Sequence, residues 1–500
     1  MIFNSFAFAG FLSCLFVLYW FVTNKNLKVQ NILLLIASYI FYGWWDWRFL
    51  LLLALLSLAN YLIGIAIESN ETNRKGKIWL IIGLITNLGI LGFFKYFNFF
   101  VDSFIDLVSL IGYDLPRSTT KIILPLGISF YVFLSLSYLI DIYKKNLAAH
   151  RNVIEVLLTL SFFPIILAGP IQRPRSLLPQ ITERREFNYE QAVDGLRQIL
   201  WGLFAKVVIA DNLANNVDNI FLNYSDYAGS TLLLGAVLYS VQIYADFSGY
   251  SNIAIGTGKL FGFNIMQNFA YPYFSRDITE FWKRWHISLT TWFRDYVFLP
   301  LSFNFSWKIK GEKVLFIRTD LFIYITASAI TWLLTGLWHG ANYTFITWGI
   351  IHGFLLIVYH LHVKPRKRLF KKLGINKNNL VIVSIETLIT IFVVVIAWIF
   401  FRADSIAQAL QYIGEIFSSS LFRISTADLR AITAGKEIIY ESLLVLMFIV
   451  FEWFRRGRQH ALQFSENQVN YLIRWSIYNA ILLLVLFYQG GQQIFIYFQF

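Results

Sequence analysis

Apolar runs of about twenty residues recur along the whole of this 500-residue chain. A helix rises about 1.5 Å per residue, so a run of this length suits a helix that crosses the roughly 30 Å hydrocarbon core of a bilayer. The runs lie at 4–22, 30–45, 48–67, 78–97, 122–142, 195–211, 231–250, 321–338, 343–362, 380–400, 439–454 and 472–489. This pattern predicts an all-α polytopic membrane protein.

The composition supports the same interpretation. Hydrophobic residues make up 57% of the chain and charged residues 14%, whereas a soluble domain has about 25% charged residues. These proportions exclude a soluble enzyme of this size and a disordered tail. The single cysteine, Cys14, excludes an intramolecular disulfide and a cysteine-based metal site. No two histidines stand in metal-ligand register with a carboxylate, so no metal is expected.

The net charge of +13 comes from short basic clusters between the apolar runs. That distribution is typical of cytoplasmic loops under the positive-inside rule, and it argues against a nucleic-acid partner. No Lys or Arg occurs from Val207 to Gly258, so the loop that carries Asp218 and Asp226 is expected on the outer face.

The stretch 153–170 ends in a proline-containing turn with basic residues on both flanks. We expect a re-entrant segment there that lines an internal cavity, because irregular backbone at membrane depth must lie against protein or water. The other runs then cross twelve times, with both termini outside. The stretch from Met1 to Trp20 has no basic start and no cleavage site, and is expected to remain as the first helix.

We expect one integral membrane domain over residues 1–500. Its parts are N-terminal helices over 1–145, a catalytic core over about 153–363 and C-terminal helices over 380–500. The stretch 251–320 is the most polar part of the chain and is the expected functional insertion.

His339 is the first candidate for chemistry. It lies between two apolar spans, and ionisable residues at membrane depth usually face a bundle interior or a wet cavity. Gly336 and Gly340 flank it at a spacing that lets another helix or a substrate come close. A neutral imidazole can take a proton from a hydroxyl, but a histidine that only bonds helices together explains the position equally well.

His286 is the second candidate, within the block from Arg276 to Tyr296. If that block is a single helix, six residues share one apolar face: Trp282, Trp285, His286, Leu289, Trp292 and Phe293. The spacing favours an amphipathic helix lying at the membrane interface. The alternative is a lid or half-helix that carries His286 into a cavity and aims basic groups at an anionic donor.

The remaining candidates have weaker signals. Few polar residues lie near His352 in the sequence, which favours a structural role for it. The chain contains no Gly-x-Ser-x-Gly motif that would support a nucleophilic serine. From the residues alone, the chain is either a transporter or an intramembrane acid–base enzyme.

Motifs spread over nearly the whole chain resemble the membrane-bound O-acyltransferase (MBOAT) family, in particular its bacterial, alginate O-acetylation branch. They are Phe41-Tyr42-Gly43-Trp44-Trp45, Phe93-Phe94-Lys95-Tyr96, Leu124-Pro125-Leu126-Gly127-Ile128-Ser129-Phe130, Ala168-Gly169-Pro170-Ile171, Tyr244-Ala245-Asp246-Phe247-Ser248-Gly249-Tyr250, the Arg276 to Tyr296 block, Gly336-Leu337-Trp338-His339-Gly340, Trp398-Ile399-Phe400-Phe401-Arg402-Ala403 and Phe495-Ile496-Tyr497-Phe498. Their order and spacing together are specific to that family.

The resemblance implies that His339 is the catalytic histidine and that His286 is also important for activity. It further implies about 11–13 transmembrane helices, with re-entrant and interfacial helices, around a central tunnel where a cytoplasmic acyl donor meets an acceptor. One departure concerns the cytoplasmic loop, where Leu299-Pro300-Leu301 runs into Ser302 and not into the Gly-Gly-Asn-Arg turn common in alginate-type members. Alginate is therefore not assumed as the substrate.

The function expected from these observations is transfer of an acyl group, most simply acetyl, to a hydroxyl of an exported polysaccharide or of a partner. His339 is the general base, and the oxyanion donor is sought among His286, Asn342, Trp338 and Trp285. Asp246 is a further candidate for the substrate tunnel. Arg173, Arg175, Lys283 and Arg284 are candidates for holding donor phosphates, although positive-inside topology explains each of them as well.

No cofactor is expected to be bound permanently, and acetyl-CoA or another acyl thioester is the expected donor. The expected partners are membrane lipid, the polysaccharide acceptor and, as the resemblance implies, a separate extracytoplasmic SGNH-type acyltransferase. Family analogy suggests a bacterial inner or plasma membrane. Two alternatives stay open: D-alanylation of teichoic acid from a carrier protein, and a transporter or flippase with His339 as a proton relay.

Overall fold

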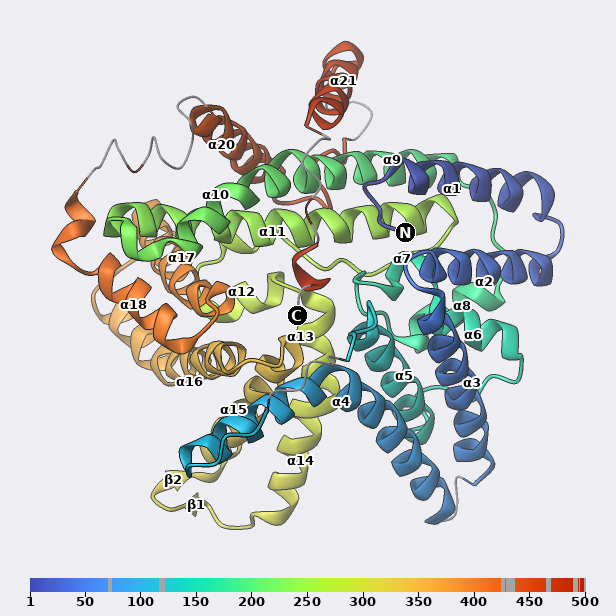
Figure 1. Cartoon of the computed structure of the whole chain (residues 1–500), viewed down its shortest axis with the longest axis horizontal. Coiled ribbons are helices and arrows are strands. Elements are labelled where there is room, and N and C mark those ends of the chain that lie inside the picture. The colour runs from blue at the N-terminus through green and yellow to red at the C-terminus, as the bar shows by residue number, and fades with distance from the viewer. Residues whose placement is uncertain are drawn as a thin grey trace. The chain divides into compact units, whose positions relative to one another are not determined.

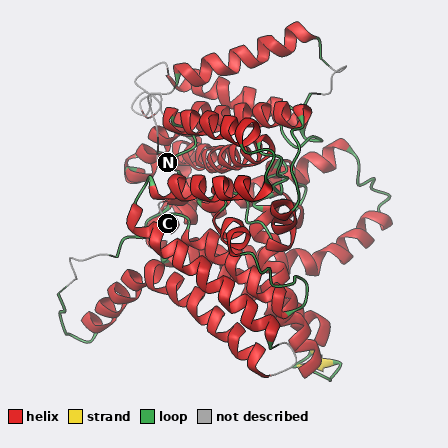
Figure 2. Cartoon of the chain, turned by 90° about the vertical axis from the view of Figure 1, so that its right-hand side faces the viewer, coloured by secondary structure: helices red, strands yellow, loops and turns green. Residues whose placement is uncertain are grey.

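The structure is a computed structural model that describes residues 1–70, 74–116, 122–423, 428, 437–464, 469–488, 493 and 495–498. It is helical almost throughout, and the strands it describes form one short hairpin (Figure 2). The chain divides into two compact units, residues 1–200 with 250–266 and residues 201–249 with 267–500. The single domain expected from the sequence stays a prediction.

Figure 1 labels the elements along the chain. Those that lie in the first unit are α1 (Phe6–Val17), the π-helical turn η1 (Leu18–Val22), α2 (Leu27–Gly43), α3 (Trp47–Ser69), α4 (Arg74–Leu110), α5 (Ile128–Tyr143), α6 (Val153–Ser161), α7 (Phe163–Ile166) and α8 (Pro174–Thr182). The chain passes from one unit to the other within α9 (Tyr189–Leu203) and within α11 (Gly229–Leu260).

The second unit contains the remaining elements. They are η2 (Phe204–Ala210), α10 (Asp211–Leu222), η3 (Tyr224–Asp226), η4 (Pro272–Phe274), α12 (Ile278–Arg284), α13 (Ile287–Phe293), η5 (Arg294–Phe298), α14 (Leu299–Lys308), β1 (Lys313–Val314), β2 (Ile317–Arg318), α15 (Thr319–His339), α16 (Tyr343–Lys372), α17 (Leu380–Arg402), α18 (Ile406–Ile416), η6 (Ser419–Phe422), α20 (Glu437–Arg455), α21 (Tyr471–Phe487) and η8 (Ile496–Phe498). β1 and β2 pair antiparallel, with Lys313 opposite Arg318.

Each of the twelve predicted apolar runs forms helix over most of its length, although the last residue of the run 472–489 lies outside the described residues. Six of the described helices are long and apolar enough to cross a membrane: α3, α4, α11, α15, α16 and α17. The chain is therefore an all-α, multi-pass membrane protein.

Several helices differ in their bounds from the predicted runs. Helices α11 and α16 each continue ten residues past the end of their runs, to Leu260 and Lys372. The run 122–142 begins to form a helix only at Ile128, because Gly127 has a φ of 73° and Pro125 precedes it. Helix α4 extends well beyond the run 78–97 and has 37 residues.

The stretch 153–170 forms the two short helices α6 and α7, which are separated at Phe162. Neither has the roughly twenty residues that a membrane crossing needs. Residues 161–170 are buried throughout, which fits the expected setting of a segment enclosed by protein. The re-entrant path and the count of twelve crossings stay predictions.

Some polar groups buried in the first unit are paired with one another. Asn60 and Asn87, on α3 and α4, exchange amide hydrogen bonds of 2.8 and 3.2 Å. The Arg185 guanidinium donates to Asn31 Oδ1 at 2.6 Å and lies over the ring of Phe263. Such reciprocal bonds remove the cost of burying these groups and tie the helices together.

In the second unit, α15 and α16 lie side by side and are joined by a three-residue turn (Figure 1). At the contact between these two helices lie glycines, which have no side chain and let the two backbones approach. A Cβ built on Gly336 would lie 2.5 Å from the carbonyl oxygen of Phe345, and one on Gly349 would lie 2.4 Å from that of Trp332. The spacing of glycine around His339 therefore serves the approach of another helix, which is one of the two uses expected from the sequence.

We expect Gly336→Ala to lower the stability of the protein by about 1–3 kcal/mol, because the added methyl group overpacks a backbone contact. Gly414→Ala is the matched control, since Gly414 lies in α18 and a Cβ there meets nothing within 4 Å. That control should be neutral or stabilising, because alanine favours helix. The midpoint of thermal unfolding in detergent measures both, and equal shifts would contradict the close helix contact.

Candidate active site

His339 is the last residue of α15, and its side chain is only 3% exposed. Aromatic rings surround the imidazole. Its ring centroid lies 4.8 Å from that of Trp348 on α16, 5.1 Å from that of Phe401 on α17 and 5.7 Å from that of Tyr497 near the C-terminus. The end of α15 thus places the imidazole in an aromatic pocket built by three other segments.

His286 lies at a break in the chain between α12 and α13 and is fully buried. Its backbone is left-handed, with φ 42° and ψ 52°. This conformation costs a residue with a Cβ about 1–2 kcal/mol, and such outliers gather at functional sites. The single helix considered for Arg276 to Tyr296 is therefore wrong, because the helix ends at Arg284 and restarts at Ile287.

A loop from another part of the chain supplies the hydrogen bonds that the broken helix lacks. The amide of Ile287 donates to the carbonyl of Asn268 at 2.9 Å, and the amide of Ala270 donates to that of Arg284 at 2.9 Å. Buried backbone groups need such partners. The loop at 268–270 therefore makes the break possible.

The side chain of Asn268 also determines which nitrogen of His286 carries the proton. Asn268 Oδ1 accepts hydrogen bonds from the amide and the hydroxyl of Ser288, at 3.3 and 2.9 Å, so this atom is the amide oxygen. His286 Nδ1 lies 3.0 Å from the same oxygen and must therefore donate to it. The other nitrogen, Nε2, is buried with an available lone pair and has no hydrogen-bond partner among the described residues.

Burial lowers the pKa of His286 to about 3, because the charged imidazolium would lose its hydration. The ring is therefore neutral at physiological pH. A neutral ring with its lone pair on Nε2 can accept a hydrogen bond or a proton, but it cannot donate through that atom.

The tryptophans of this block do not lie in a headgroup region. All six residues of the predicted apolar face are buried within the protein. The ring of Trp285 stacks on Phe281 and packs against Trp398 at 4.8 Å between centroids. The interfacial amphipathic helix favoured by the spacing is therefore wrong, because aromatic residues of α12, α16 and α17 cover this stripe.

Tyr497 and Trp338 connect the two histidines. The Tyr497 ring lies 5.7 Å from His339 and 6.1 Å from His286, and the Trp338 ring lies 4.9 and 5.9 Å from them. Both imidazoles therefore lie in one buried cluster of aromatic rings. The C-terminal segment supplies one of these rings, Tyr497.

A buried ion cluster holds that segment in place. Lys206 Nζ lies 2.7 Å from carboxylate oxygens of both Asp211 and Asp246, and it donates to the carbonyl of Gln493 at 3.2 Å. The other oxygen of Asp246 accepts from the amide of Ile496 at 2.8 Å. Asp246, expected to line a substrate tunnel, thus anchors the backbone beside Tyr497.

A cavity of about 470 Å³ lies between α12, α13, η5, α15 and α16. Its lining residues include Trp282, Lys283, Thr290, Thr291, Arg294, Tyr324, Ser328, Thr331, Trp332 and Thr335. Ser328, Thr331 and Thr335 follow one face of α15, and Thr335 stands one helical turn before His339. The cavity therefore runs along the helix that ends at this histidine.

Hydroxyl groups in this cavity are oriented by their own helices. Thr331 and Thr335 donate to carbonyls of α15 at 2.7 and 2.8 Å, and Thr291 donates to the Ile287 carbonyl at 2.7 Å. Their protons are thereby used within the helices. The oxygen lone pairs of Thr331 and Thr335 can accept from N–H or O–H donors of a ligand.

The four basic candidates are divided between the two units of the chain. Lys283 lines the cavity, whereas the neighbouring Arg284 forms an ion pair with Glu280. Arg173 and Arg175 belong to the first unit, where Arg173 is buried and donates to the carbonyl of Ile171 and Arg175 is exposed. A phosphate-holding role stays a prediction for all four.

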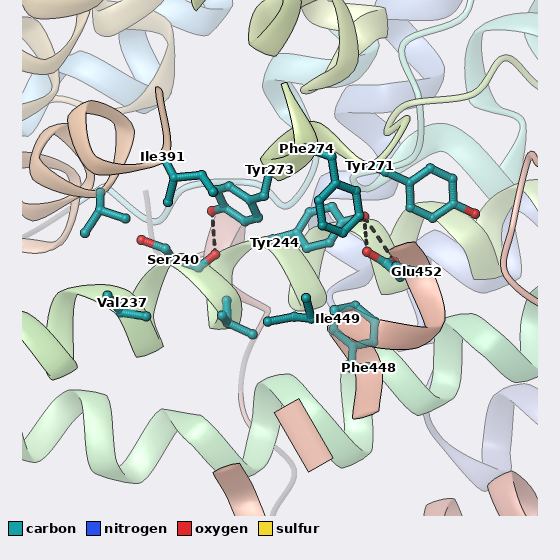
Figure 3. Close-up of a pocket in the computed structure, with 12 residues that line it drawn as sticks. Val237, Ser240, Tyr244, Tyr271, Tyr273, Phe274, Ile391, Phe448, Ile449 and Glu452 are labelled. Carbon is teal, nitrogen blue, oxygen red and sulfur yellow. Dashed lines mark hydrogen bonds between the residues drawn. The ribbon is translucent and has the colours of Figure 1, made fainter. Parts of the chain in front are cut away.

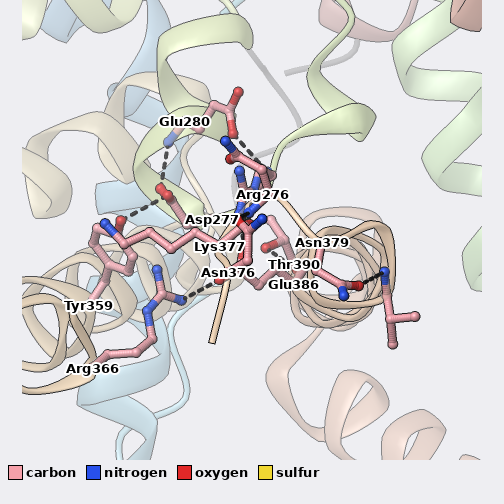
Figure 4. A network of polar contacts seen from close by, with 12 residues as sticks. Arg276, Asp277, Glu280, Tyr359, Arg366, Asn376, Lys377, Asn379, Glu386 and Thr390 are labelled. Carbon is pink, nitrogen blue, oxygen red and sulfur yellow. Dashed lines mark hydrogen bonds and ion pairs between the residues drawn. The ribbon is translucent and has the colours of Figure 1, made fainter. Parts of the chain in front are cut away.

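A polar network fixes the start of α12 (Figure 4). The Arg276 guanidinium donates to Glu386 on α17 at 2.9 Å and to the carbonyl of Lys377 at 2.6 Å. Asp277 caps α12 through the amide of Glu280 and accepts from the hydroxyl of Tyr359 on α16 at 2.8 Å. Helix α12 is therefore tied to both α16 and α17 before the chain reaches His286.

Asn342 does not face the histidine pocket as a free donor. Its Oδ1 accepts from the amide of Thr344, which caps α16, and its Nδ2 donates to the carbonyl of Asp404 at 3.1 Å. Both ends of this amide are thus used to fix the turn after His339. Among the oxyanion candidates, the Trp338 indole has the ring nearest to both histidines.

Comparison with known proteins agrees with this architecture. Residues 143–401 match the MBOAT, membrane-bound O-acyltransferase family. Over 455 residues, the chain is 38% identical to the probable alginate O-acetylase AlgI of Pseudomonas aeruginosa, covering 91% of this chain and 81% of the relative. The chain belongs to the membrane-bound O-acyltransferase family.

Two further relatives have names that state other acceptors than alginate. The peptidoglycan O-acetyltransferase of Helicobacter pylori is 30% identical over 515 residues, which cover 95% of this chain and 92% of the relative. The teichoic acid D-alanyltransferase of Bacillus subtilis is 29% identical over 255 residues, which cover 49% of this chain and 60% of the relative. This MBOAT protein is an acyltransferase, so the transporter alternative is not supported.

Sequence reasoning missed three residues of the acyltransferase that the structure brings into view. Asn268 gave no signal, because its partner lies 18 residues away across a turn. Tyr497 belongs to a motif used for the resemblance, but nothing in its spacing pointed to the histidines. Glu452 could have been found as one of two carboxylates, with Glu441, within the apolar run 439–454, since such residues are rare at membrane depth.

Glu452 lies in the wall of a second, smaller cavity of about 160 Å³ (Figure 3). The Tyr244 hydroxyl donates to both its carboxylate oxygens, at 2.9 and 3.1 Å. The other walls are almost entirely apolar, from Val237 on α11 to Ile391 on α17. This cavity contains none of the residues predicted for the site, although Tyr244 packs against Trp285.

We expect His286→Gly to be more stable than His286→Ala by about 1 kcal/mol, since glycine adopts φ 42° without a Cβ penalty. Both variants lose the same imidazole, so their difference isolates the backbone. At Leu410, an exposed position in α18, the order should reverse, because glycine disfavours helix. Thermal unfolding in detergent measures the four variants, and a more stable His286→Ala would refute the left-handed break.

We expect Lys206→Met to lower stability by about 3–5 kcal/mol, because it leaves Asp211 and Asp246 buried without a cation. Lys308→Met is the control, since Lys308 is exposed at the end of α14. The measurement is the midpoint of thermal unfolding, combined with protease sensitivity of a C-terminal tag. A tag as resistant in Lys206→Met as in the wild type would show that the cluster does not hold the C-terminal segment.

Proposed function

We propose that this protein transfers an acetyl group from a cytoplasmic thioester donor to a hydroxyl of an exported polysaccharide or of its extracytoplasmic partner. The observation that carries the proposal is the pocket in which His339 and His286 face the same two rings, Tyr497 and Trp338. Acyl transfer to a hydroxyl needs a base beside a site for the developing oxyanion.

His339 is the proposed general base. Its imidazole takes the proton of the acceptor hydroxyl as the oxygen attacks the thioester carbonyl carbon. The tetrahedral intermediate then collapses, the carbon–sulfur bond breaks, and the leaving thiolate recovers the proton from the imidazolium. The products are the ester and the free thiol, and the histidine is regenerated.

His286 is proposed to orient the acceptor rather than to bind the oxyanion. Its Nε2 lone pair can accept a hydrogen bond from the acceptor, whereas the Nδ1 proton is used by Asn268. The Trp338 indole N–H is the proposed oxyanion donor, because it can only donate and, among the candidates, its ring lies nearest to both imidazoles.

The 470 Å³ cavity is the proposed site of the donor's thioester arm. A pantetheine arm carries amide N–H groups, which match hydroxyl oxygens whose own protons are used within α13 and α15. Lys283 at its wall can attract an anionic donor such as acetyl-CoA. The cavity ends at Thr335, about 6 Å along the helix axis from His339.

The acceptor is proposed from the relatives, whose names state alginate, peptidoglycan and teichoic acid as their targets. These are polymers found outside the cytoplasm. We therefore place the enzyme in the bacterial inner or plasma membrane, in contact with lipid. An SGNH-type acyltransferase outside the membrane is proposed to complete the transfer to the polymer.

A second candidate is D-alanyl transfer from a carrier protein, which the similarity to the teichoic acid D-alanyltransferase favours. The same base, attack and leaving thiol serve that reaction. The released acid distinguishes the two, because alkaline hydrolysis of the polymer gives acetate in one case and D-alanine in the other.

We expect His339→Ala to reduce the O-acyl content of the exported polymer by at least about 100-fold, the range for loss of a general base. His286→Ala should also reduce it strongly. His362→Ala is the control, because His362 is exposed and bonds only to a carbonyl of its own helix among the described residues. The measurement is base release and mass spectrometry in a complemented deletion strain at equal membrane levels.

Full O-acylation with His339→Ala would show that this histidine only packs, and the mechanism would fail. Loss of O-acyl groups with the control as well would point to a folding defect. The mass of the released acid decides between the two acyl groups in the same experiment.

A further inference from the structure

Trp282 lies between the large cavity and the pocket of His339. It lines the cavity on one side. On the other side its ring lies 5.6 Å from that of Trp348, which in turn packs edge-on against His339 at 4.8 Å. One series of ring contacts from the cavity to His339 therefore passes through the Trp282 and Trp348 indoles.

The neighbouring Trp332 packs beside Trp282 at the wall of the cavity. Its ring lies 4.5 Å from that of Trp282 and also lines the cavity. Trp332 is fixed, because the backbone of α15 at this position is in contact with Gly349 of α16. Trp282 is on the short helix α12, which is separated from α13 by the break at His286. The Trp282 indole is held at this cavity wall by a hydrogen bond to His352.

His352 bonds to the Trp282 indole. It is fully buried on α16, and its Nδ1 accepts from Trp282 Nε1 at 3.3 Å. An indole N–H can only donate, so Nδ1 is unprotonated and the neutral ring carries its proton on Nε2. That Nε2 has no hydrogen-bond partner among the described residues. The bond to Trp282 is therefore the polar contact that the described structure gives this histidine, which the sequence favoured as merely structural.

We propose that Trp282 is a partition between the donor cavity and the His339 pocket, and that His352 is the positioning residue that holds it closed. The proposal rests on the proposed function, in which the cavity holds the thioester arm. When the partition is closed, a thioester in the cavity is kept from His339 and from water there. Its opening admits the acyl group for transfer.

The chemical consequence is control of a side reaction. Transfer consumes the thioester and an acceptor hydroxyl and gives an ester and a thiol. Hydrolysis consumes the thioester and water and gives a carboxylic acid and the same thiol. Both reactions need the same base, so a partition that stays open without acceptor favours hydrolysis.

The first experiment tests the pairing and does not depend on the identity of the donor. Polymer O-acyl content is measured in cells with Trp282→Phe, His352→Leu and the double variant. Each single change removes one end of the hydrogen bond and leaves the partition open. The thioester is then lost to hydrolysis, so each change should reduce O-acylation about fivefold, the factor for one hydrogen bond. The double variant should be no worse than either single one.

Two further variants separate positioning from packing. His352→Asn places an amide near the position of Nδ1 and can still accept from the indole, so it should restore O-acylation. His362→Leu removes an exposed histidine of the same helix and should have no effect. Independent, additive losses at Trp282 and His352, or a His352→Asn variant as defective as His352→Leu, would overturn the proposal.

The second experiment uses acetyl-CoA as the probe, with purified protein in proteoliposomes and no acceptor. Release of free thiol reports hydrolysis. We expect it to be low in the wild type and in His352→Asn, to rise about fivefold in Trp282→Phe and His352→Leu, and to return to background when His339→Ala is added. A merely structural role of His352 would not raise hydrolysis.

The two experiments separate failure of this proposal from failure of the proposed function. If no variant releases thiol while the cellular losses are non-additive, acetyl-CoA is not the donor and the pairing stands. If His339→Ala leaves thiol release and O-acylation unchanged, the proposed function fails. If hydrolysis is unchanged in His352→Leu while it depends on His339, the partition is wrong and the function stands.

Discussion

The hydrogen bonds of Asn268 are the constraint on which the histidine pocket depends. A helix that continued through residues 284–287 would satisfy its own backbone and would carry His286 along its side. The loop at 268–270 replaces those bonds from outside, so the chain can turn at His286 in a left-handed conformation. The Asn268 side chain then fixes the imidazole tautomer. One loop thus supplies both the break in the helix and the protonation pattern of the ring that the break presents.

The fold followed from the sequence because it depends on local hydrophobicity and length. Apolar runs of about twenty residues have few alternatives to helix in a bilayer, where each backbone group must be bonded within its segment. Glycine near His339 likewise predicted a close helix contact, which Gly336 makes with Phe345. The limits of this reasoning appear at Ile128 and at Phe162, where proline and glycine change the helix ends in ways that hydropathy does not register.

The site was only partly predictable, because it depends on contacts between distant parts of the chain. The apolar stripe from Trp282 to Phe293 was expected at the membrane interface, whereas the structure buries it within the protein. Its period fits one helix and two short helices equally well. Nothing local could reveal that Asn268 bonds across the break or that Tyr497 reaches His339. The roles of both histidines came from the resemblance to the family, since position alone left His339 undecided between chemistry and packing.

The helices that carry the two histidines are constrained by different contacts, and this difference suits the proposed roles of the two residues. His339 ends a long helix whose backbone touches α16 through paired glycines, so little can shift it. His286 follows a helix of seven residues that is tied at its start by Arg276 and Asp277 and at its middle by the bond from Trp282 to His352. Those ties contact α16 and α17, the helices that also supply Trp348 and Phe401 to the His339 pocket. A movement of α12 would therefore change the surroundings of both histidines, while the proposed base, His339, is held by α15.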